Sequence, residues 1–179
     1  MLDDQHLKSL VKKSQDGNRD AFGEIYDVMS EPVYRFIYMR VQHNETAEDL
    51  VSLTFLKAWK KIYTYKERHN VKFSTWLFQI SHNTVRDHWR GKKYDENIDD
   101  HIFTDSLSGQ FEEALDRKIE FAKVLNAMKR LPQNHQSVLT LRFINQLSVE
   151  ESAKVLGKTN GGLRVMQVRA LKALRNIIT

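Results

Sequence analysis

Cysteine is absent from the 179-residue chain, and proline and glycine are scarce, with two and seven residues. Without cysteine there are no disulfides, thiolate zinc sites or cysteine nucleophiles, which fits a reducing compartment. Few prolines and glycines leave few turns for an all-β fold, so long helices are expected. No apolar run approaches the ~18 residues that a membrane span needs, and the first residues lack a signal-peptide pattern. We therefore expect a cytoplasmic protein that is not inserted into a membrane.

Charge is distributed unevenly along the chain, although the net charge is only +5. Residues 1–94 hold 16 basic and 12 acidic residues, and residues 117–179 hold 12 basic and three acidic ones. Residues 95–116, by contrast, hold eight acidic residues and no basic one. Basic segments on both sides of an acidic segment indicate a polyanionic partner. The sequence thus predicts two domains, 1–94 and 117–179, joined by an acidic linker, 95–116.

Apolar residues recur at intervals of three and four along most of the chain, which predicts amphipathic helices and an all-α fold. Pro32 predicts a break or a kink in the first helix, near Glu31. Ser74 is expected to cap the third helix at its N-terminus. The second predicted helix begins after Asn44 or Thr46 and ends near Ile62. The other predicted helices cover about 20–41, 74–91, 113–130, 133–144, 148–156 and 160–177.

The C-terminal pattern is that of a helix-turn-helix, whose second helix enters the major groove. Ser148 and Glu151 form a capping-box signature at the start of a short helix, which stops at Gly157 before a long basic helix. A helical hairpin with a solvated basic face is the alternative. Arg and Gln side chains can read guanine and adenine, while other contacts hold phosphates. The candidate base readers are Asn160, Arg164, Gln167 and Val168, and the candidate phosphate contacts are Lys158, Thr159, Arg169 and Lys172.

Aromatic and basic residues are interleaved through residues 73–93. This mixture suits single-stranded nucleic acid, because cations follow the backbone and aromatic faces or pockets receive unstacked bases. Tyr65, in the preceding loop, is the better stacking candidate, since Trp76 and Trp89 each favour a core position. Asn83 offers both a donor and an acceptor to a base edge. The basic residues of this segment are Arg86, Arg90, Lys92 and Lys93.

The segment 48–62 has more apolar residues than one buried helix face needs. Such a helix is either fully buried or presents a face to a partner, and the spacing alone slightly favours burial. No motif for catalysis, phosphate cradling or metal binding occurs in the chain. We therefore expect no enzyme activity, no metal and no cofactor.

Several motifs, taken together and in order, resemble the sigma-70 family of bacterial transcription initiation factors. With two domains and a short linker, the chain is similar to the extracytoplasmic-function (ECF) group. The resemblance covers about 20–94 and 117–176. The motifs are Asp49-Leu-Val and Thr54-Phe-Leu-Lys-Ala-Trp, then Phe73-Ser-Thr-Trp-Leu-Phe-Gln-Ile-Ser-His-Asn, then Leu131-Pro, Leu139-Thr-Leu-Arg-Phe, Leu147-Ser-Val-Glu-Glu, Val155-Leu-Gly and Arg169-Ala-Leu.

The resemblance implies a promoter-specificity factor that binds core RNA polymerase and recognises −35 and −10 promoter elements. The domain 1–94 would dock on polymerase and open the −10 element, and 117–179 would read the −35 element. The acidic linker would pass through basic channels of the polymerase. An anti-sigma protein is a further expected partner. The implied polymerase contacts are Asp49, Ser52, Leu53, Leu56 and Lys60, and the implied −10 contacts are Tyr65, Lys72, Trp76, Asn83, Arg86, Arg90 and Lys92.

Two other functions remain open at this point. A conventional helix-turn-helix regulator would bind duplex operator DNA without polymerase. A pure interaction protein would bind only protein partners and would show no salt-dependent affinity for DNA.

Overall fold

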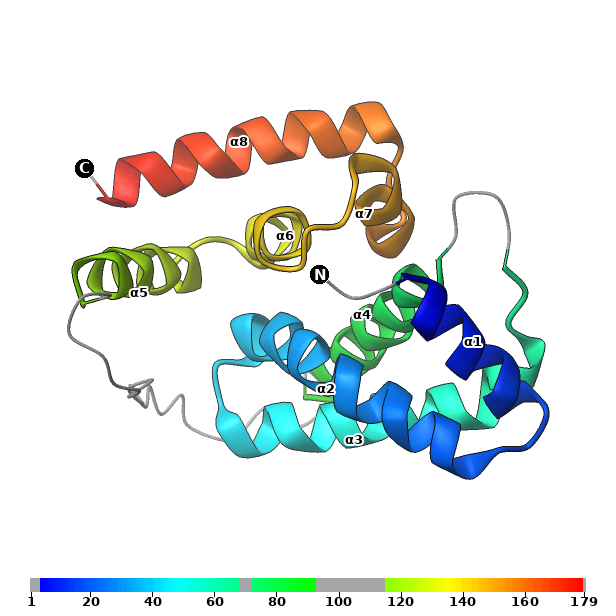
Figure 1. The fold of residues 1–179 in the computed structure, drawn as a ribbon. Coiled ribbons are helices and arrows are strands. Elements are labelled where there is room, and N and C mark those ends of the chain that lie inside the picture. The colour runs from blue at the N-terminus through cyan, green and yellow to red at the C-terminus, as the bar shows by residue number, and fades with distance from the viewer. Residues whose placement is uncertain (1–3, 68–71, 93–114, 179) are drawn as a thin grey trace.

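The computed structural model describes residues 4–67, 72–92 and 115–178, and all regular structure within these ranges is helical. The all-α prediction is confirmed. We call α1–α4 the N-terminal lobe and α5–α8 the C-terminal lobe (Figure 1). The elements are α1 (Asp4–Gln15), α2 (Arg19–Val41), α3 (Asn44–Lys61), the 3-10 turn η1 (Ile62–Thr64), α4 (Phe73–Lys92), α5 (Leu115–Lys129), α6 (Gln133–Leu139), the π-helical turn η3 (Thr140–Ile144), α7 (Val149–Leu156) and α8 (Asn160–Ile178).

The long helix α2 forms the centre of the N-terminal lobe and packs against α1, α3 and α4. Its buried residues follow helical spacing, so one broad face is apolar. Val33, Phe36 and Ile37 are completely buried. The ring of Phe36 packs edge to face on the ring of Phe78 of α4, with 5.6 Å between the ring centroids. Gln42 ends the helix in the left-handed conformation (φ 54°) and lets the chain reverse into α3.

Two local features differ from the sequence-based expectations, and a third agrees in part. The helix α2 continues through Pro32 and its axis bends partway along (Figure 1), so of the predicted break or kink the structure has the kink. Ser74 lies inside α4, which begins one residue earlier at Phe73, so it is not the N-cap. The helix α1 was not predicted; its buried residues Leu7, Leu10, Val11 and Ser14 have amphipathic spacing that could have shown it.

The C-terminal lobe packs α5, α6 and α7 against one side of α8. Its core includes Leu131, Val138, Leu139, Leu163 and Ala170, all nearly or fully buried. The helices α7 and α8 form the predicted helix-turn-helix, with α8 lying along the outer edge of the molecule (Figure 1).

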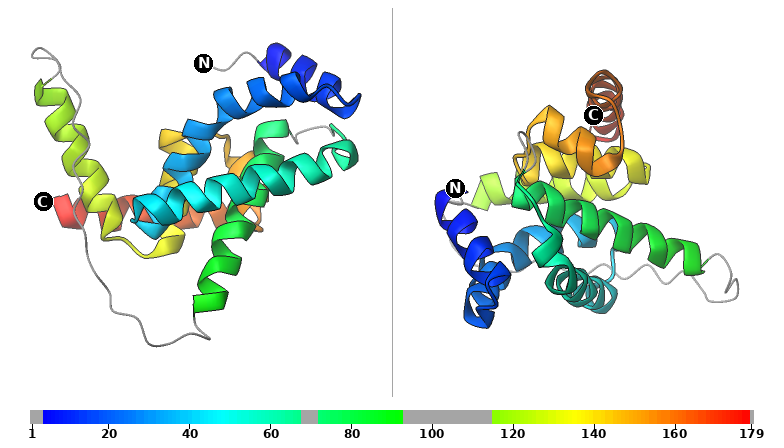
Figure 2. Two further views of the ribbon diagram at one scale, coloured as in Figure 1. Left: turned by 90° about the horizontal axis from the view of Figure 1, so that it is seen from below. Right: turned by 90° about the vertical axis from the view of Figure 1, so that its right-hand side faces the viewer.

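The two lobes lie directly against each other (Figures 1 and 2). Helix α4 packs on α7, while α2 packs on α5, α6 and η3. Met39 of α2 belongs to the C-terminal core, and Leu141, Leu147 and Val155 belong to the N-terminal core. The structure is therefore a closed form, in which each lobe covers helix surface of the other. The predicted linker, 95–116, lies outside the described residues except for its last two positions in α5.

Side-chain hydrogen bonds to backbone carbonyls cross the boundary between the lobes. Gln79 Nε2 of α4 donates to the carbonyl of Lys154 at 3.1 Å. Asn145 Nδ2 donates to the carbonyl of Pro32 at 3.0 Å, within the bent helix α2. Because hydrogen bonds are directional, these two bonds fix the orientation of the lobes more closely than apolar packing alone would.

The end of α2 makes a further polar contact with α5. Gln42 Nε2 donates to the carbonyl of Lys129 at 2.9 Å. The Lys129 ammonium in turn lies 5.1 Å from the centroid of the Tyr38 ring, in cation–π geometry. The last turn of α2 is thus attached to the last turn of α5.

A buried arginine joins α2 to α4. Arg40 is 8% exposed, and its Nη1 lies 2.9 Å from Nδ1 of His82. Burial lowers the pKa of Arg40 to about 10. Burial, followed by the charges of Arg40 and Arg86, lowers the pKa of His82 to about 4. His82 is therefore neutral near pH 7, and its Nδ1 accepts the hydrogen bond from the guanidinium.

We predict that the protein loses stability as the pH falls from about 6.5 to about 4. The unfolded chain protonates His82 near pH 6.5, whereas the folded chain does so only near pH 4. The unfolded state therefore binds more protons in this window, and the free energy of unfolding decreases. Urea unfolding of the wild type and of His82→Gln across this range measures the effect, with a flatter profile expected for the variant. An NMR titration that finds His82 protonating near pH 6.5 in the folded protein would contradict this account.

Candidate nucleic-acid interface

Both helices of the helix-turn-helix have capped ends. Ser148 accepts a hydrogen bond from the Glu151 N–H at 3.1 Å, and the Glu151 carboxylate accepts one from the Ser148 N–H at 2.7 Å. The predicted capping box is confirmed. Gly157 ends α7 in the left-handed conformation (φ 62°), which glycine adopts without steric cost. Thr159 Oγ1 then accepts the Gly162 N–H at 3.0 Å and caps α8.

The outward face of α8 carries most of the predicted DNA contacts. Arg164, Val168, Arg169 and Lys172 are exposed on the helix, and Lys158, Thr159 and Asn160 are exposed at its start. Because α8 packs on its own lobe with the opposite side, this face is accessible in the closed form. The arrangement provides cations for phosphates and side chains for base edges.

Gln167 lies apart from that face and is half-buried. Its Oε1 accepts a hydrogen bond from Arg142 Nε at 3.1 Å. Arg142 Nη1 also donates to the carbonyl of Leu147, just before α7. Arg142 therefore fixes α8 to the segment that leads into α7. The sequence motif Leu139-Thr-Leu-Arg-Phe includes this arginine but predicts no role for it, because its partner Gln167 lies 25 positions further along the chain.

The predicted −10 face lies on α4. Asn83, Arg86 and Arg90 are exposed on one side of the helix, and both arginines lie within 4 Å of the carboxylate of Asp87. Exposed ion pairs of this kind are weak and are readily exchanged for phosphates. The side chain of Lys92 lies outside the described part of the chain.

Lys72 lies just before α4 and points back to the first turn of α1. Its ammonium is 2.5 Å from an oxygen of Asp4. Hydrogen bonding to this carboxylate raises the pKa of Lys72. Lys72, a predicted −10 contact, is therefore charged, and in the closed form it forms an ion pair with Asp4 of the same lobe.

Tyr65, the predicted stacking residue, lies in an aromatic cluster. Its ring contacts Phe73 edge to face at 5.4 Å and Trp76 in a tilted arrangement at 5.3 Å. Only 9% of Tyr65 is exposed, and burial, followed by the charge of Glu67, raises its pKa to about 12. Gln15 Nε2 donates to its carbonyl at 2.7 Å. The structure thus brings Tyr65 and Trp76 together, and Trp76 is the more accessible of the two.

The five predicted polymerase contacts share one exposed face of α3. Leu53 is 39% exposed and Leu56 is 48% exposed, while Leu50, Val51 and Phe55 are buried. The apolar surplus of this helix is therefore divided between a core face and an accessible one. Asp49, Ser52 and Lys60 surround the two leucines with polar groups.

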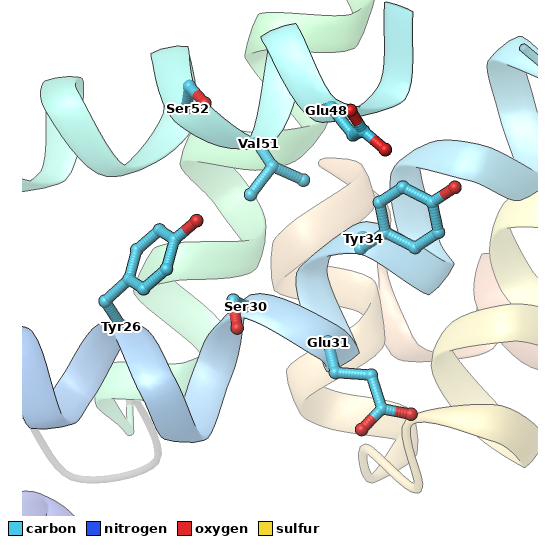
Figure 3. Close-up of a pocket in the computed structure, with 7 residues that line it drawn as sticks. All are labelled: Tyr26, Ser30, Glu31, Tyr34, Glu48, Val51 and Ser52. Atoms are coloured by element: carbon cyan, nitrogen blue, oxygen red, sulfur yellow. The ribbon is translucent and has the colours of Figure 1, made fainter. Parts of the chain in front are cut away.

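A pocket of about 440 Å³ adjoins this face between α2 and α3 (Figure 3). Val51 lies between Tyr26 and Tyr34, and Glu31 and Glu48 stand at the same end of the pocket. Glu31 is paired with Arg35 at 2.7 Å. The pKa of Tyr34 is raised by burial and then by the charges of Tyr38 and Glu48. This opening is aromatic with acidic groups at its rim.

No three histidine, aspartate or glutamate residues gather into a metal site within 4–67, 72–92 and 115–178. Over these same ranges, none of the helices combines the length and the apolar character needed to cross a bilayer.

Comparison with protein families matches both lobes. Residues 25–94 match Sigma-70 region 2, and residues 127–176 match Sigma-70, region 4. The first match covers most of α2, all of α3 and all of α4. The second covers the helix-turn-helix with the helices that support it.

Individual relatives extend over nearly the whole chain. The ECF RNA polymerase sigma factor BldN of Streptomyces coelicolor is 36% identical over 180 residues, covering 98% of this chain and 67% of BldN. The ECF RNA polymerase sigma factor SigM of Bacillus subtilis is 31% identical over 160 residues, covering 86% of this chain and 94% of SigM.

Solved structures show the same fold at lower identity. CnrH, in complex with the cytosolic domain of CnrY, matches with a TM-score of 0.71 and 22% identity over 97% of both chains. RpoE of Bartonella quintana, in complex with the anti-sigma factor NepR, matches with a TM-score of 0.70 and 20% identity over 88% of this chain and 96% of RpoE.

The fold and the exposed faces define a two-lobed helical DNA-binding protein. The family matches and the relatives are more specific: the chain belongs to the sigma-70 family of RNA polymerase sigma factors, in the ECF group. It is a promoter-specificity factor that binds core RNA polymerase and directs transcription initiation from −35 and −10 elements. The comparisons do not support the alternative of a regulator that works without polymerase.

Two adjacent glycines at the start of α8 provide a matched test of the local structure. A Cβ at Gly161 meets no atom within 4 Å, whereas a Cβ at Gly162 lies 3.1 Å from Thr159 Oγ1. We predict that Gly161→Ala raises the free energy of unfolding by about 0.5–1 kcal/mol through helix propensity. Gly162→Ala is expected to gain less or to lose stability, because it crowds the cap. Urea unfolding of both variants measures the difference, and equal gains would contradict the described geometry.

Proposed function

We propose that the two lobes divide promoter recognition between them, with domains 1–94 and 117–179 and a linker at 95–116. The C-terminal lobe reads the −35 duplex with α8, and the N-terminal lobe binds polymerase through α3 and the −10 strand through α4. The observation that carries this proposal is the placement of the predicted residues on separate exposed faces of α8, α4 and α3.

The proposed −35 contacts fall into two energetic classes. Lys158, Arg169 and Lys172 bind phosphates and provide salt-dependent affinity with little sequence preference. Arg164 reads a base edge, where one good contact discriminates by about 1–3 kcal/mol. Gln167 would reach a base only by exchanging its contact with Arg142. The remaining members of the proposed set are Thr159, Asn160 and Val168.

The proposed −10 contacts surround the aromatic cluster of the N-terminal lobe. Arg86 and Arg90, with Lys72 and Lys92, would follow the melted strand, and Asn83 would hydrogen-bond an extruded base. Trp76 is partly exposed and would stack on a base, whereas Tyr65 is buried against the Trp76 ring. Such a pocket would offset part of the unstacking energy of a few kcal/mol.

The exposed face of α3 is proposed to dock on core polymerase. Leu53 and Leu56 form its apolar centre, with Asp49, Ser52 and Lys60 at its rim. The adjoining pocket would extend this contact, and its acidic rim favours a basic side chain of the polymerase. Two exposed leucines amid polar groups fit the usual pattern of a small interface centre with a polar rim.

The closed form cannot contact both elements of one promoter at once. The −35 and −10 elements are centred roughly 25 base pairs apart, which is about 85 Å of duplex at 3.4 Å per base pair. In the closed form, however, α4, which would bind the −10 strand, is in contact with α7 of the helix-turn-helix. Moreover, α7 holds Gln79, which lies one helical turn from both Trp76 and Asn83. We propose that polymerase binding separates the lobes and uncovers this part of α4.

Three further features complete the proposal. The protein has no catalytic activity of its own, and it acts in the cytoplasm, where the polymerase is. An anti-sigma factor regulates it; support comes from CnrH and RpoE, whose structures were solved with CnrY and with the anti-sigma factor NepR.

Variants on α3 and α8 should separate polymerase binding from promoter recognition. Arg164→Ala is expected to weaken −35-dependent initiation by about five- to 150-fold, equivalent to 1–3 kcal/mol, with unchanged polymerase binding. Leu53→Ala combined with Leu56→Ala should reduce polymerase binding itself. Pull-down with core polymerase and run-off transcription on a promoter library measure both properties. Loss of both properties in Arg164→Ala would refute the division, and failure of the wild type to direct any initiation would refute the function.

Locking the lobes together should prevent initiation. The chain has no native cysteine, so Gln79→Cys with Lys154→Cys can be joined across the boundary by a short, cleavable thiol cross-linker. We expect run-off transcription to be lost after cross-linking and restored after cleavage. His6→Cys with Glu24→Cys joins two elements of the N-terminal lobe, whose native side chains lie 3.8 Å apart, and serves as the matched control. Full activity of the cross-linked Gln79/Lys154 pair would contradict the proposed opening.

A further inference from the structure

Two valines are exposed on the outward face of α8. Val165 is 52% exposed and Val168 is 66% exposed, although valine is among the residues most often buried. They are three residues apart and therefore lie on the same side of the helix. The core of the lobe meets the opposite side, where Leu163 and Ala170 are fully buried. The two valines therefore contribute little to the fold and are available to a partner.

Positive charge surrounds these valines. Arg164 precedes Val165, Arg169 follows Val168, and Lys172 lies one turn further along, all of them exposed. A partner that covers the valines must therefore accept several cations at the same time. A DNA major groove meets both requirements, because phosphates line its edges and thymine presents an apolar C5-methyl group on its floor.

We propose that Val168, with Val165 beside it, recognises the C5-methyl groups of thymines in the −35 element. This inference rests on the proposed role of α8 as the −35-reading helix. Arg164 selects by hydrogen bonding, whereas the valines select by apolar contact, so the helix distinguishes thymine from cytosine at neighbouring positions. Removal of one such methyl should reduce affinity about two- to ten-fold, the size expected for one buried methyl group.

Deoxyuridine tests this directly, because it keeps every hydrogen-bonding group of thymine and lacks only the methyl. The wild type is first assembled with core polymerase, and −35 sequences are selected from a promoter library by run-off transcription. One selected promoter is then made with thymine throughout or with deoxyuridine at a single −35 position, each thymine position in turn. At one of these positions we expect the wild type to bind the deoxyuridine promoter about two- to ten-fold more weakly, and Val168→Ala to lose most of this difference.

Ile178→Ala is the matched control. Ile178 is an exposed aliphatic residue of the same helix (51% exposed), but it lies ten residues beyond Val168, or about 15 Å along the axis. It should keep the full deoxyuridine effect. Since Val168 and Ile178 are both exposed, neither substitution is expected to disturb folding, and thermal unfolding checks this.

Two results would overturn the proposal. One is a selected −35 element without thymine. The other is an equal deoxyuridine effect in the wild type and Val168→Ala at every thymine position; if Val168→Ala then binds both promoters more weakly by the same factor, a protein surface covers the valines instead. Failure of the proposed function would be distinct, because no promoter would then be selected in the first step.

Discussion

The contact between α4 and α7 constrains everything else in this structure, because it joins the proposed surface for the melted strand to the lobe that we propose reads the duplex. It is made of buried apolar side chains, with Gln79 donating across the boundary to the carbonyl of Lys154. Each core also contains residues from the other lobe: Met39 of α2 packs in the C-terminal core, and Val155 of α7 packs in the N-terminal core. A chain built in this way is compact on its own, yet its task requires two distant contacts on DNA.

The proposed functional faces differ in how accessible they are in the closed form. The outward face of α8 and the leucine face of α3 stay accessible, whereas α4 is partly covered around Gln79. Polymerase and duplex could therefore engage before the lobes part, and the single-strand surface would become available last. Such an order would restrict strand capture to a chain already seated on the polymerase.

Much of the fold could be predicted from the sequence, because its helices are amphipathic and their caps are local. The capping box at Ser148 and the glycine stop at position 157 depend on residues a few positions apart. The division of α3 was harder: spacing alone does not tell which of Leu50, Leu53 and Leu56 meets the core. The lobe contact could not be predicted, since Gln79 and Asn145 bond to carbonyls that lie 75 and 113 positions away in the sequence. Tyr65 illustrates the same limit, as its loop position suggested exposure while Phe73 and Trp76 enclose it.

The central claim is that one chain adopts a closed form alone and an open form on the polymerase. Dyes on Glu45→Cys and Asn126→Cys, both exposed positions near the contact between Gln42 and Lys129, report the separation of the lobes by energy transfer. The account predicts efficient transfer in the free protein and little transfer once core polymerase and promoter are bound. Efficient transfer that persists in an actively initiating complex would contradict it.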